Sequence, residues 1–359
     1  MKDTERVCRY FLSIWSSGPQ GAREKAFFLI LIFFSVLYGA CVRLIVYCYR
    51  RRIFRKQHAP LRVIGVGNIT VGGTGKTPLC ALLSEYCSAG SRVPVIVMRG
   101  HGNPDSRGGI SDESILLSQK LRAPVLVSKR RLPAIMRAYR EYGSRCVILD
   151  DAFQQWGIRK DIEIVIIDSL APFGNRRLLP AGPLREPIAH IARADMVLLS
   201  NARLCEVHAL KELRQEVARY VGEEAIYEVS HVPVCFRNIQ DATELPPSGL
   251  EGKNALLFCG IGNPVSFEKT VASLGIAVRR RRYFSDHYWY TQKDLDDIAT
   301  ECADKGVFCA VTTEKDAVRL QGLITRVLPS PLYVMKTALA FPPADGERFY
   351  ERISRMLDA

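Results

Sequence analysis

Short apolar runs alternate with longer amphipathic stretches from Leu61 onward. The runs lie at residues 61–67, 93–100, 123–128, 146–151, 162–168 and 195–200. Most are rich in Val, Ile and Leu, which is typical of strands buried on both faces of a parallel sheet. The stretches between them, such as residues 77–90 and 132–143, have the spacing of amphipathic helices. The alternation predicts a βαβ series, and hence a doubly wound α/β domain with its sites at the carboxyl ends of the strands.

This rhythm breaks between residues 229 and 252, where Pro, Ser and Gly cluster and a short β-rich connection is expected. A second series of apolar runs follows, at residues 254–263, 275–284, 306–316 and 331–336. We therefore expect a larger α/β domain over residues 50–228. A smaller α/β domain over residues 229–359 is expected to close over the active site.

A long apolar segment at residues 26–49 lies behind the N-terminal segment of residues 1–25. It contains one charge, Arg43, and the cluster Arg50–Arg52 follows it. As a helix rising about 1.5 Å per residue, the segment could reach across a hydrocarbon core of about 30 Å. A buried core helix is the alternative, but the segment is apolar on all sides and flanked by arginines. We expect a membrane-associated helix, either spanning the bilayer or embedded in one leaflet, with the later domains in the cytoplasm.

The net charge of +13 is concentrated near this segment, because residues 1–60 carry +8 of it. A basic excess beside an apolar helix favours an anionic inner-membrane lipid surface over nucleic acid as a partner. No obligate protein partner is indicated. The 11 cysteines form no Cys-x-x-Cys pair, which favours free thiols in a reducing compartment and gives no metal-ligand spacing.

Residues 67–78, GNITVGGTGKTP, join the first predicted strand to the first predicted helix. A glycine-rich turn in that context predicts a phosphate-binding loop, and a chance glycine-rich turn is the alternative. The usual formula has Gly where this chain has Thr70, and another residue is tolerable there if its φ is negative. Lys76 would neutralise the β- and γ-phosphates of ATP, and the Thr77 hydroxyl would bind Mg²⁺. The expected nucleotide-binding residues are Thr70, Val71, Gly72, Gly73, Thr74, Gly75, Lys76 and Thr77.

Two carboxylates, Asp150 and Asp151, end the apolar strand CVILDD. An apolar strand that ends in an acid, downstream of a phosphate loop, is typical of a Mg²⁺-binding strand. Helix-capping or solvated acids are the alternative interpretation.

Polar residues also follow other predicted strands. Arg99 and His101 lie in VMRGHGN, at the carboxyl end of a strand. Asp112 and Glu113 lie in SDES, ahead of an apolar helix. Asp112 fits either a catalytic acid that faces the phosphate loop or a helix N-cap, and the residues alone favour the cap.

Two later stretches combine charge with an unusual composition. Residues 176–187, RRLLPAGPLREP, are too rich in Pro and Gly for a helix, so they predict a stiff loop holding Arg185–Glu186. Such a loop is either functional or a rigid surface turn. FSDHYWYT places Asp286 and His287 among aromatics, after Arg279–Arg282. The histidine could orient a base or bind an anionic headgroup, and the arginines fit a basic rim or a solvated strand end.

Together these stretches resemble one family, the tetraacyldisaccharide 4'-kinases, the lipid A 4'-kinases of Gram-negative bacteria. The resemblance runs in order through GNITVGGTGKTP, MRGHG, SDES, LDDAFQQW, LLPAGPLREP, GIGNP, FSDHYWYT and TTEKDAVRL, from about residue 60 onward. Thr at the position of Thr70 is normal in this family. The resemblance implies two P-loop NTPase-like α/β domains joined by a short β linker, with a membrane-associated N-terminal helix.

The resemblance also implies an activity. It is the transfer of the γ-phosphate of ATP to the 4'-hydroxyl of an acylated glucosamine disaccharide 1-phosphate, giving the 1,4'-bisphosphate lipid A precursor. The enzyme would lie at the inner membrane with its catalytic domains on the cytoplasmic face. Lys76 and Thr77 match the residues that hold ATP with Mg²⁺.

Further site residues are implied by motif. Asp112 matches the proposed general base of the family, and His287 matches a histidine thought to pair with it. Asp150 and Asp151 match acids near Mg²⁺. The remaining expected residues of the substrate or active-site loops are Arg99, Arg131, Arg185 and Glu186.

The chain departs from the usual motifs at a few positions. Ala152 and Gln155 stand where Gly and His are usual, and His101 stands where Tyr is usual. SDES keeps the acid of the usual GDEP but lacks its Pro. The absence of His at position 155 implies that this side chain is not indispensable to the chemistry.

Other functions share a phosphate loop. A membrane-bound ATPase switch would carry a further signature lysine near Thr70 and Val71, and it leaves the FSDH stretch unexplained. A soluble small-molecule kinase leaves the apolar helix unexplained. A requirement for a lipid disaccharide in ATP consumption distinguishes these functions. Because Asp112 and His287 fall in different predicted domains, domain closure is expected to assemble the site.

Overall fold

The computed structural model describes residues 14–15, 18–100, 112–303, 306–324 and 328–358. These residues form two compact units that interleave along the chain. Unit 1 holds the described residues of Met1–Gly100, Leu121–Val229 and Phe341–Ala359. Unit 2 holds those of His101–Lys120 and Ser230–Ala340. The sequence predicts consecutive domains instead. Nothing in it indicates that a segment near residue 112 folds with the second unit, or that the end of the chain folds with the first.

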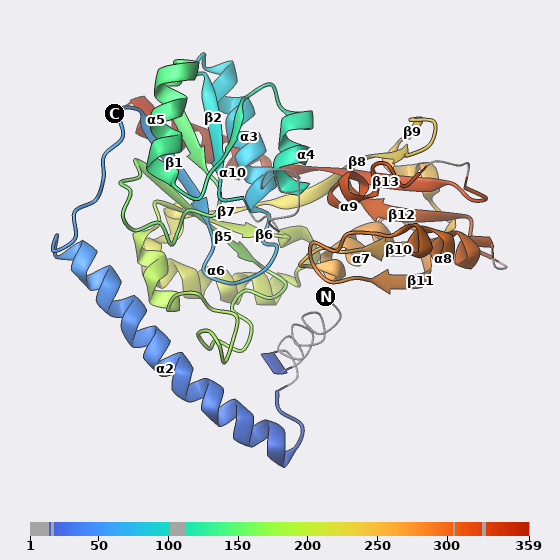
Figure 1. Cartoon of the computed structure of the whole chain (residues 1–359), viewed down its shortest axis with the longest axis horizontal. Helices are drawn as coiled ribbons and strands as arrows, with labels where there is room; N and C mark the ends of the chain where they lie inside the picture. The colour runs from blue at the N-terminus through green and yellow to red at the C-terminus, as the bar shows by residue number, and fades with distance from the viewer. Residues whose placement is uncertain (1–13, 16–17, 101–111, 304–305, 325–327, 359) are drawn as a thin grey trace. The chain divides into compact units, whose positions relative to one another are not determined.

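A seven-stranded parallel sheet forms the centre of unit 1 (Figure 1), in the order β3-β2-β4-β1-β5-β6-β7. The strands are β1 Arg62–Gly67, β2 Pro94–Met98, β3 Val125–Val127, β4 Cys146–Leu149, β5 Ile162–Asp168, β6 Met196–Ser200 and β7 Ile226–Glu228. All six apolar runs predicted before residue 228 are strands of this sheet. β1 lies in its middle between β4 and β5, so the loop after β1 is next to the residues that follow β4.

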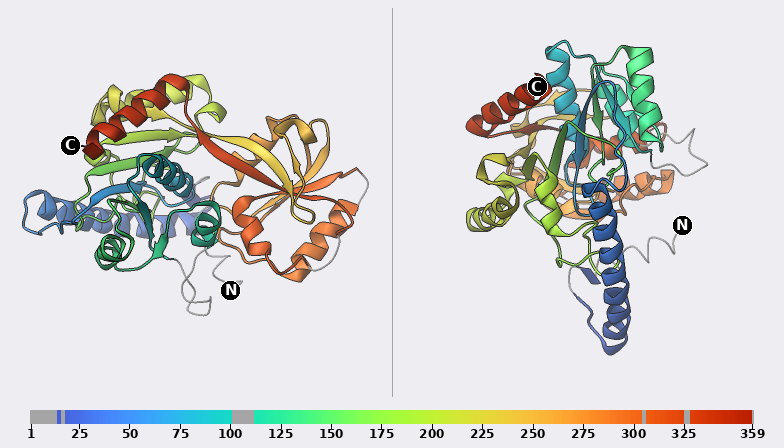
Figure 2. Two further views of the ribbon diagram at one scale, coloured as in Figure 1. Left: turned by 90° about the horizontal axis from the view of Figure 1, so that it is seen from above. Right: turned by 90° about the vertical axis from the view of Figure 1, so that its left-hand side faces the viewer.

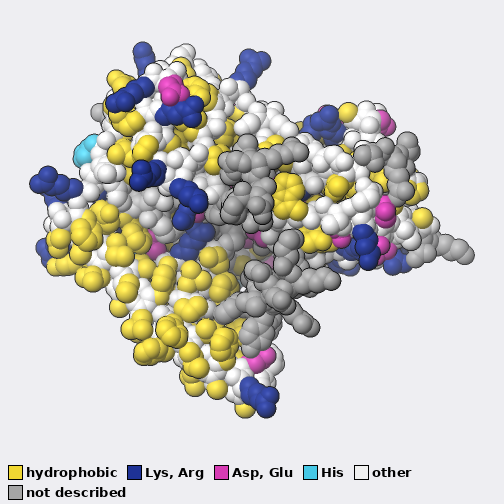
Figure 3. Space-filling view, in the orientation of Figure 1, with side chains coloured by type: hydrophobic (Ala, Val, Ile, Leu, Met, Phe, Trp, Pro, Cys, Tyr) yellow, Lys and Arg dark blue, Asp and Glu magenta, His cyan; other side chains and the backbone are white. Residues whose placement is uncertain are grey.

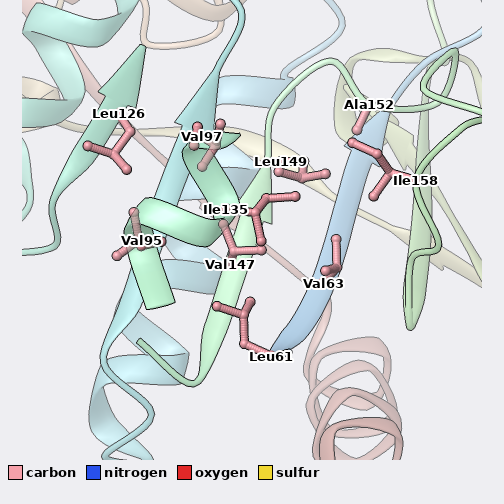
Figure 4. Packing of buried hydrophobic residues seen from close by; sticks show 12 residues of the cluster. Leu61, Val63, Val95, Val97, Leu126, Ile135, Val147, Leu149, Ala152 and Ile158 are labelled. Atoms are coloured by element: carbon pink, nitrogen blue, oxygen red, sulfur yellow. The ribbon is translucent and has the colours of Figure 1, made fainter. Parts of the chain in front are cut away.

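Helices cover both faces of this sheet (Figure 2). They are α3 Lys76–Ala89, α5 Arg131–Tyr142, α6 Val207–Val221 and α10 Pro343–Asp358. On one face, Ile135 of α5 packs among Val95, Val97 and Val147 in a cluster of buried aliphatic side chains (Figure 4). Each such side chain contributes about 1.5–3 kcal/mol when it is fully buried, so the packing of these helices stabilises the sheet that carries the loops.

The last helix, α10, returns to unit 1. Tyr350 stacks on Tyr86 of α3, with ring centroids 4.8 Å apart. Phe349 is fully buried and lies edge-on to Tyr227 of β7. The end of the chain therefore completes the sheet face that α3 begins to cover.

Unit 2 is built on a six-stranded mixed sheet, in the order β11-β10-β12-β13-β8-β9. Its strands are β8 Ser230–Asn238, β9 Glu244–Leu245, β10 Asn254–Cys259, β11 Ala277–Tyr283, β12 Cys309–Thr313 and β13 Leu332–Ala340. Its helices are α4 Asp112–Lys120, α7 Pro264–Ala272, α8 Gln292–Ala303 and α9 Glu314–Leu320. The four predicted runs are parallel strands, and the expected β-rich connection contributes β8, which pairs antiparallel with β13.

The apolar segment forms one continuous helix, α2 Ala22–Arg50, which confirms the helix predicted over residues 26–49. Its 29 residues extend about 43 Å. Among the described residues, α2 is the one helix long and apolar enough to cross a membrane.

One face of α2 lies against the rest of unit 1. The buried positions follow the three- and four-residue spacing of a helix face: Leu31, Ser35, Gly39, Val42 and Val46. The Ser35 hydroxyl donates to the Leu178 carbonyl at 2.8 Å, and the Tyr38 hydroxyl donates to the Arg185 carbonyl at 2.8 Å. Hydrophobic side chains gather on the remaining surface of α2 (Figure 3), including Leu29, Phe33, Val36 and Leu44, each more than 60 % exposed.

Candidate active site

The loop after β1 has the backbone of a phosphate-binding loop. Gly72 and Gly75 adopt φ angles of 117° and 99°, in the region that favours glycine. Gly75 is also the N-cap of α3, so the unpaired N–H groups of the first helical turn belong to the same loop. The Asn68 amide donates to the Thr74 hydroxyl at 3.2 Å, and the Ser200 hydroxyl donates to the Thr74 carbonyl at 3.0 Å. These two hydrogen bonds to Thr74 help to hold the loop in shape.

Thr70 forms an antiparallel bridge with Leu184 and is buried. Flanking backbone bonds of 2.8 and 2.7 Å run from Val71 N–H to the Pro183 carbonyl and from Arg185 N–H to the Ile69 carbonyl. Extended backbone suits a β-branched residue, which is a physical reason for Thr where the general formula has Gly. The bridge fastens residues 176–187, here called the Pro/Gly-rich loop, to the phosphate loop.

The two acids after β4 have different surroundings. Asp150 is buried, and its Oδ2 accepts from the Thr77 hydroxyl at 3.4 Å. Asp151 accepts from Arg185 at 2.8 Å and lies 3.7 Å from Nζ of Lys76. Asp150 therefore faces a hydroxyl, whereas Asp151 faces two cations.

The oxygens of Thr77 and Asp150 fit Mg²⁺, which prefers oxygen ligands and usually takes few of them from the protein. In the part of the chain that the structure describes, no group of three or more His, Cys, Asp or Glu side chains could hold a metal. The donor set thus suits a metal shared with nucleotide phosphates. Asp151 suits it less well, because its carboxylate already binds Arg185 and lies beside Lys76.

Arg131 joins the ends of two central strands. It is buried at the start of α5 and donates to the carbonyls of Val97 and Asp150. Burial lowers the pKa of this guanidinium, partly against the attraction of Asp150 and Asp151, and nearby Arg99 lowers it further. These contacts are with backbone oxygens, so Arg131 fixes the backbone that carries Asp150 and Asp151 and does not bind their carboxylates.

Glu186 is fully buried within the Pro/Gly-rich loop and accepts several hydrogen bonds. Arg193 donates at 2.6 and 3.1 Å, and His190 Nδ1 lies at 2.7 Å. Gln154 and Trp156 donate at 3.1 and 3.3 Å. Burial would raise the pKa of Glu186, but the bonds from His190 and Arg193 outweigh it and lower the pKa. A carboxylate with its acceptor sites used in this way fastens the loop.

Asp112 lies in unit 2 at the start of α4, with 5 % of its side chain exposed. Its two carboxylate oxygens lie 3.1 and 3.2 Å from Nδ1 of His287. Arg319 of α9 donates to Asp112 through Nε at 2.7 Å and also through Nη2. These contacts favour the functional interpretation of Asp112 over a helix cap. The expectation that domain closure brings Asp112 and His287 together is wrong, because both lie in unit 2 and are already in contact.

The charges of this group are strongly coupled. Burial would raise the pKa of the Asp112 carboxyl, but His287 and Arg319 hold it well below its usual range. The hydrogen bond with Asp112 raises the pKa of His287, against an opposing effect of burial. Asp112 is therefore ionised throughout the physiological range, and His287 titrates above its ordinary pKa.

The arginines of β11 are engaged within unit 2. Arg281 pairs with Glu268, and Arg282 pairs with Glu301 at 2.6 Å. Arg279 donates to the side chain of Asn254 at 3.0 Å. These contacts favour the solvated strand end over a basic rim for the substrate.

The site residues fall into two groups. The nucleotide group of unit 1 surrounds the phosphate loop and contains Lys76, Thr77, Asp150, Asp151 and Arg185. The carboxylate–histidine group of unit 2 contains Asp112, His287 and Arg319. Of the departures from the usual family motifs, Ala152 is fully buried and belongs to the same cluster of aliphatic side chains as Ile135 of α5 (Figure 4). His101 lies outside the described residues.

Sequence reasoning missed Arg319, His190 and Arg193. Arg319 stands in TTEKDAVRL, so its signal was membership of a family motif, but its partner Asp112 is 207 positions away. His190 and Arg193 follow Glu186 at helical spacing, in a short segment with no apolar periodicity to draw attention to it.

The chain matches known proteins along almost all of its length. The profile of a family described as "LpxK: Tetraacyldisaccharide-1-P 4'-kinase" matches residues 27–358. A tetraacyldisaccharide 4'-kinase of Halothermothrix orenii is 31 % identical over 336 residues, which cover 86 % of this chain and 87 % of that protein. One of Halorhodospira halophila is 35 % identical over 300 residues, which cover 80 % and 83 %.

A solved structure agrees with these relatives. The crystal structure of the "apo" form of LpxK from Aquifex aeolicus in complex with ATP matches with a TM-score of 0.66 and 25 % identity, covering 90 % of this chain and 97 % of that one. The fold, the phosphate loop and the extent of these matches lead to one conclusion: the chain belongs to the tetraacyldisaccharide-1-P 4'-kinase (LpxK) family.

Proposed function

We propose that this chain transfers the γ-phosphate of ATP to the 4'-hydroxyl of a tetraacyldisaccharide 1-phosphate, giving the 1,4'-bisphosphate in lipid A biosynthesis. The family match carries this proposal, because it extends over residues 27–358 and so includes both groups of site residues. The matched Aquifex aeolicus structure is a complex with ATP, which supports the choice of phosphate donor.

The nucleotide group binds and polarises ATP. Backbone N–H groups of the phosphate loop and the start of α3 bind the phosphates, and Lys76 neutralises their charge. Thr77 and Asp150 would hold Mg²⁺, which stabilises charge on the β- and γ-phosphates when it is bound. Asp151 lies between Arg185 and Lys76, so it keeps two cations beside the loop where negative charge develops.

The carboxylate–histidine group removes the proton of the sugar hydroxyl. Its members are joined by hydrogen bonds within unit 2, so the acid–base pair is preorganised. Phosphoryl transfer needs the hydroxyl oxygen to reach both this group and the γ-phosphate. In this mechanism unit 1 binds the nucleotide, and unit 2 carries the residues for proton transfer.

The helix α2 keeps the enzyme at its lipid substrate. Unit 1 covers one face of α2 from Leu31 to Val46, so that face cannot contact lipid. The exposed apolar side chains of the opposite surface suit insertion into one leaflet, with the helix along the membrane surface. The basic cluster Arg50–Arg52 suits the anionic cytoplasmic leaflet of the inner membrane. The free cysteines suit the same side, because thiols stay reduced in the cytoplasm.

A mixed-micelle assay with γ-labelled ATP tests the proposal. The acceptors are tetraacyldisaccharide 1-phosphate and the same disaccharide without acyl chains. We expect label in the acylated disaccharide, at the 4'-position, and loss of this product in Lys76→Ala. Lys211→Ala on α6, an exposed lysine of unit 1, is the matched control and is expected to retain the wild-type rate.

The outcomes separate the competing functions. ATP hydrolysis without labelled lipid would refute the kinase and favour an ATPase switch. Equal labelling of the deacylated sugar would favour a soluble sugar kinase, because the acyl chains would then contribute nothing to recognition.

A further inference from the structure

Two hydroxyl side chains of α2 bond to the Pro/Gly-rich loop. Ser35 donates to the Leu178 carbonyl and Tyr38 donates to the Arg185 carbonyl, each at 2.8 Å. Ser35 is buried, and Tyr38 is partly buried. Membrane binding needs neither hydroxyl, because an interfacial helix enters lipid through its apolar side chains. These two bonds therefore call for a role of α2 within the protein.

Further contacts bring the N-terminal part of the chain close to the same loop. A Cβ on Gly39, one turn after Ser35, would lie 2.7 Å from Cδ1 of Leu178, so the helix backbone itself approaches the loop. The Trp15 indole N–H donates to the Pro180 carbonyl at 3.1 Å. The loop is thus contacted at several points, besides the two hydroxyl bonds.

Arg185 joins α2 to two parts of the nucleotide group. Its backbone carbonyl accepts from Tyr38, and its backbone N–H donates at 2.7 Å to the carbonyl of Ile69 in the phosphate loop. Its guanidinium donates to Asp151 at 2.8 Å, and Asp151 lies 3.7 Å from Nζ of Lys76. A single residue therefore separates the Tyr38 hydroxyl from both the phosphate loop and the acids after β4.

The Pro/Gly-rich loop is stiff enough to transmit these contacts. Leu179 N–H donates to the Leu184 carbonyl at 2.9 Å, and Gly182 N–H donates at 3.0 Å to the Leu178 carbonyl that also accepts from Ser35. The prolines of the loop fix φ at further positions. A displacement at either contact with α2 is consequently passed on to the end of the loop that carries Arg185.

We propose that Tyr38 and Ser35 are positioning residues for the ATP site, which hold the Pro/Gly-rich loop, and with it Arg185, against the phosphate loop. The inference rests on the proposed function, because it takes ATP as the nucleotide that unit 1 binds. The two residues act through Arg185 and not on the nucleotide itself. The helix that binds the membrane thus also sets the affinity of the enzyme for ATP.

Glu186 is a second anchor of the loop. Its buried carboxylate accepts from Arg193 at 2.6 Å, and this fixes the end of the loop through a side chain. Tyr38 instead binds the backbone of Arg185, whose side chain meets Asp151. Two anchors on neighbouring residues restrict the orientation of the Arg185 guanidinium more than one does. If the Glu186 anchor were sufficient, loss of the α2 hydroxyls would leave ATP binding unchanged.

The ATP affinity of Tyr38→Phe tests the proposal. The substitution removes one hydroxyl and keeps the ring, and isothermal titration calorimetry with ATP and Mg²⁺ is run on the full chain in detergent. We expect the Kd to rise by about two- to tenfold, the effect of one hydrogen bond. Ser35→Ala should have a smaller effect, because the Leu178 carbonyl keeps its bond from Gly182. Tyr47→Phe, at an exposed tyrosine of the same helix, is the control and should bind ATP as the wild type does.

Steady-state kinetics separate this role from membrane anchoring. In mixed micelles, Tyr38→Phe should raise the KM for ATP by about the same two- to tenfold. Its KM for tetraacyldisaccharide 1-phosphate and its binding to anionic vesicles should not change. The reverse result, a higher KM for the lipid with the KM for ATP intact, would show that Tyr38 serves membrane binding alone and would overturn the proposal. A lower kcat with both KM values intact would show a loss of folded enzyme and would also contradict it.

Amide hydrogen exchange measures the loop without turnover. The N–H groups of Val71 and Arg185 form the backbone bonds between the Pro/Gly-rich loop and the phosphate loop. We expect both amides to exchange faster in Tyr38→Phe than in the wild type and in Tyr47→Phe. Unchanged exchange would overturn the inference even if the ATP affinity fell. A wild-type protein that did not bind ATP would instead refute the proposed function.

Discussion

Gly67 shows how a single residue is constrained where two segments approach closely. A Cβ on Gly67 would lie 2.5 Å from the backbone nitrogen of Phe153 and 2.6 Å from its Cβ. Phe153 is buried and follows the two acids after β4, so it cannot yield without moving the turn that carries them. The requirement for glycine at this position is therefore steric.

Gly67→Ala is expected to lower the free energy of unfolding by about 1–3 kcal/mol, the usual cost of overpacking. The measurement is urea unfolding in detergent. Gly21→Ala is the control, because nothing lies within 4 Å of a Cβ there and its φ is −132°. Equal midpoints for Gly67→Ala and the wild type would show that the turn after β4 moves freely.

Residues whose role depends on their neighbours in the sequence can be predicted from the sequence. Lys76 and Thr77 could be identified because a phosphate loop is one continuous stretch between a strand and a helix. Arg319 could not be identified, because the sequence around an arginine on a helix does not show whether its side chain is buried. Its role is clear only when its partner is known. Asp112 and Arg319 meet only after unit 2 has folded.

The element that best shows the limits of pattern reading is α2. Its existence and its approximate ends follow from a run of apolar residues between charges. The buried face could not be predicted, because the buried Leu31, Val42 and Val46 are of the same types as the exposed Leu29, Val36 and Leu44. The two polar contacts of α2, from Ser35 and Tyr38, mark its protein-facing side only once their carbonyl partners are known.

The two faces of α2 predict different effects of the same substitution. Phe33→Lys and Val36→Lys together should weaken binding to anionic vesicles by at least about tenfold, because each apolar side chain contributes about 1.5–3 kcal/mol on burial. Thermal stability should change little, since both side chains are more than 60 % exposed. Vesicle co-sedimentation measures the binding. Val207→Lys on α6, where the valine is 86 % exposed, is the control and should bind as the wild type does. Unchanged binding of the double variant would mean that this face does not contact lipid.

The whole molecule combines a predictable pair of sheets with an unpredictable division of the chain. Local apolar runs were sufficient to predict β1 to β6 of the unit 1 sheet and β10 to β13 of the unit 2 sheet, but they did not indicate the short β7. The interleaving was not predictable, because it depends on long-range pairs such as Lys315 with Glu113 in unit 2 and Tyr86 with Tyr350 in unit 1. As a result, α4 belongs to unit 2 although it lies between β2 and β3 in sequence, and it brings Asp112 to α9.

This division predicts that nucleotide binding and proton transfer can be lost separately. Asp112→Asn should bind ATP with Mg²⁺ as tightly as the wild type, because the nucleotide group lies in unit 1, while its turnover falls by about 10²–10⁴. Thr77→Ala should lose ATP affinity in the presence of Mg²⁺, because it removes a hydroxyl that lies beside Asp150. Isothermal titration calorimetry and the labelled-lipid assay, run on the same preparations, measure both quantities. If Asp112→Asn lost ATP affinity as severely as Thr77→Ala, the two groups would not be independent, and Asp112 would have to act on the nucleotide as well as on the imidazole.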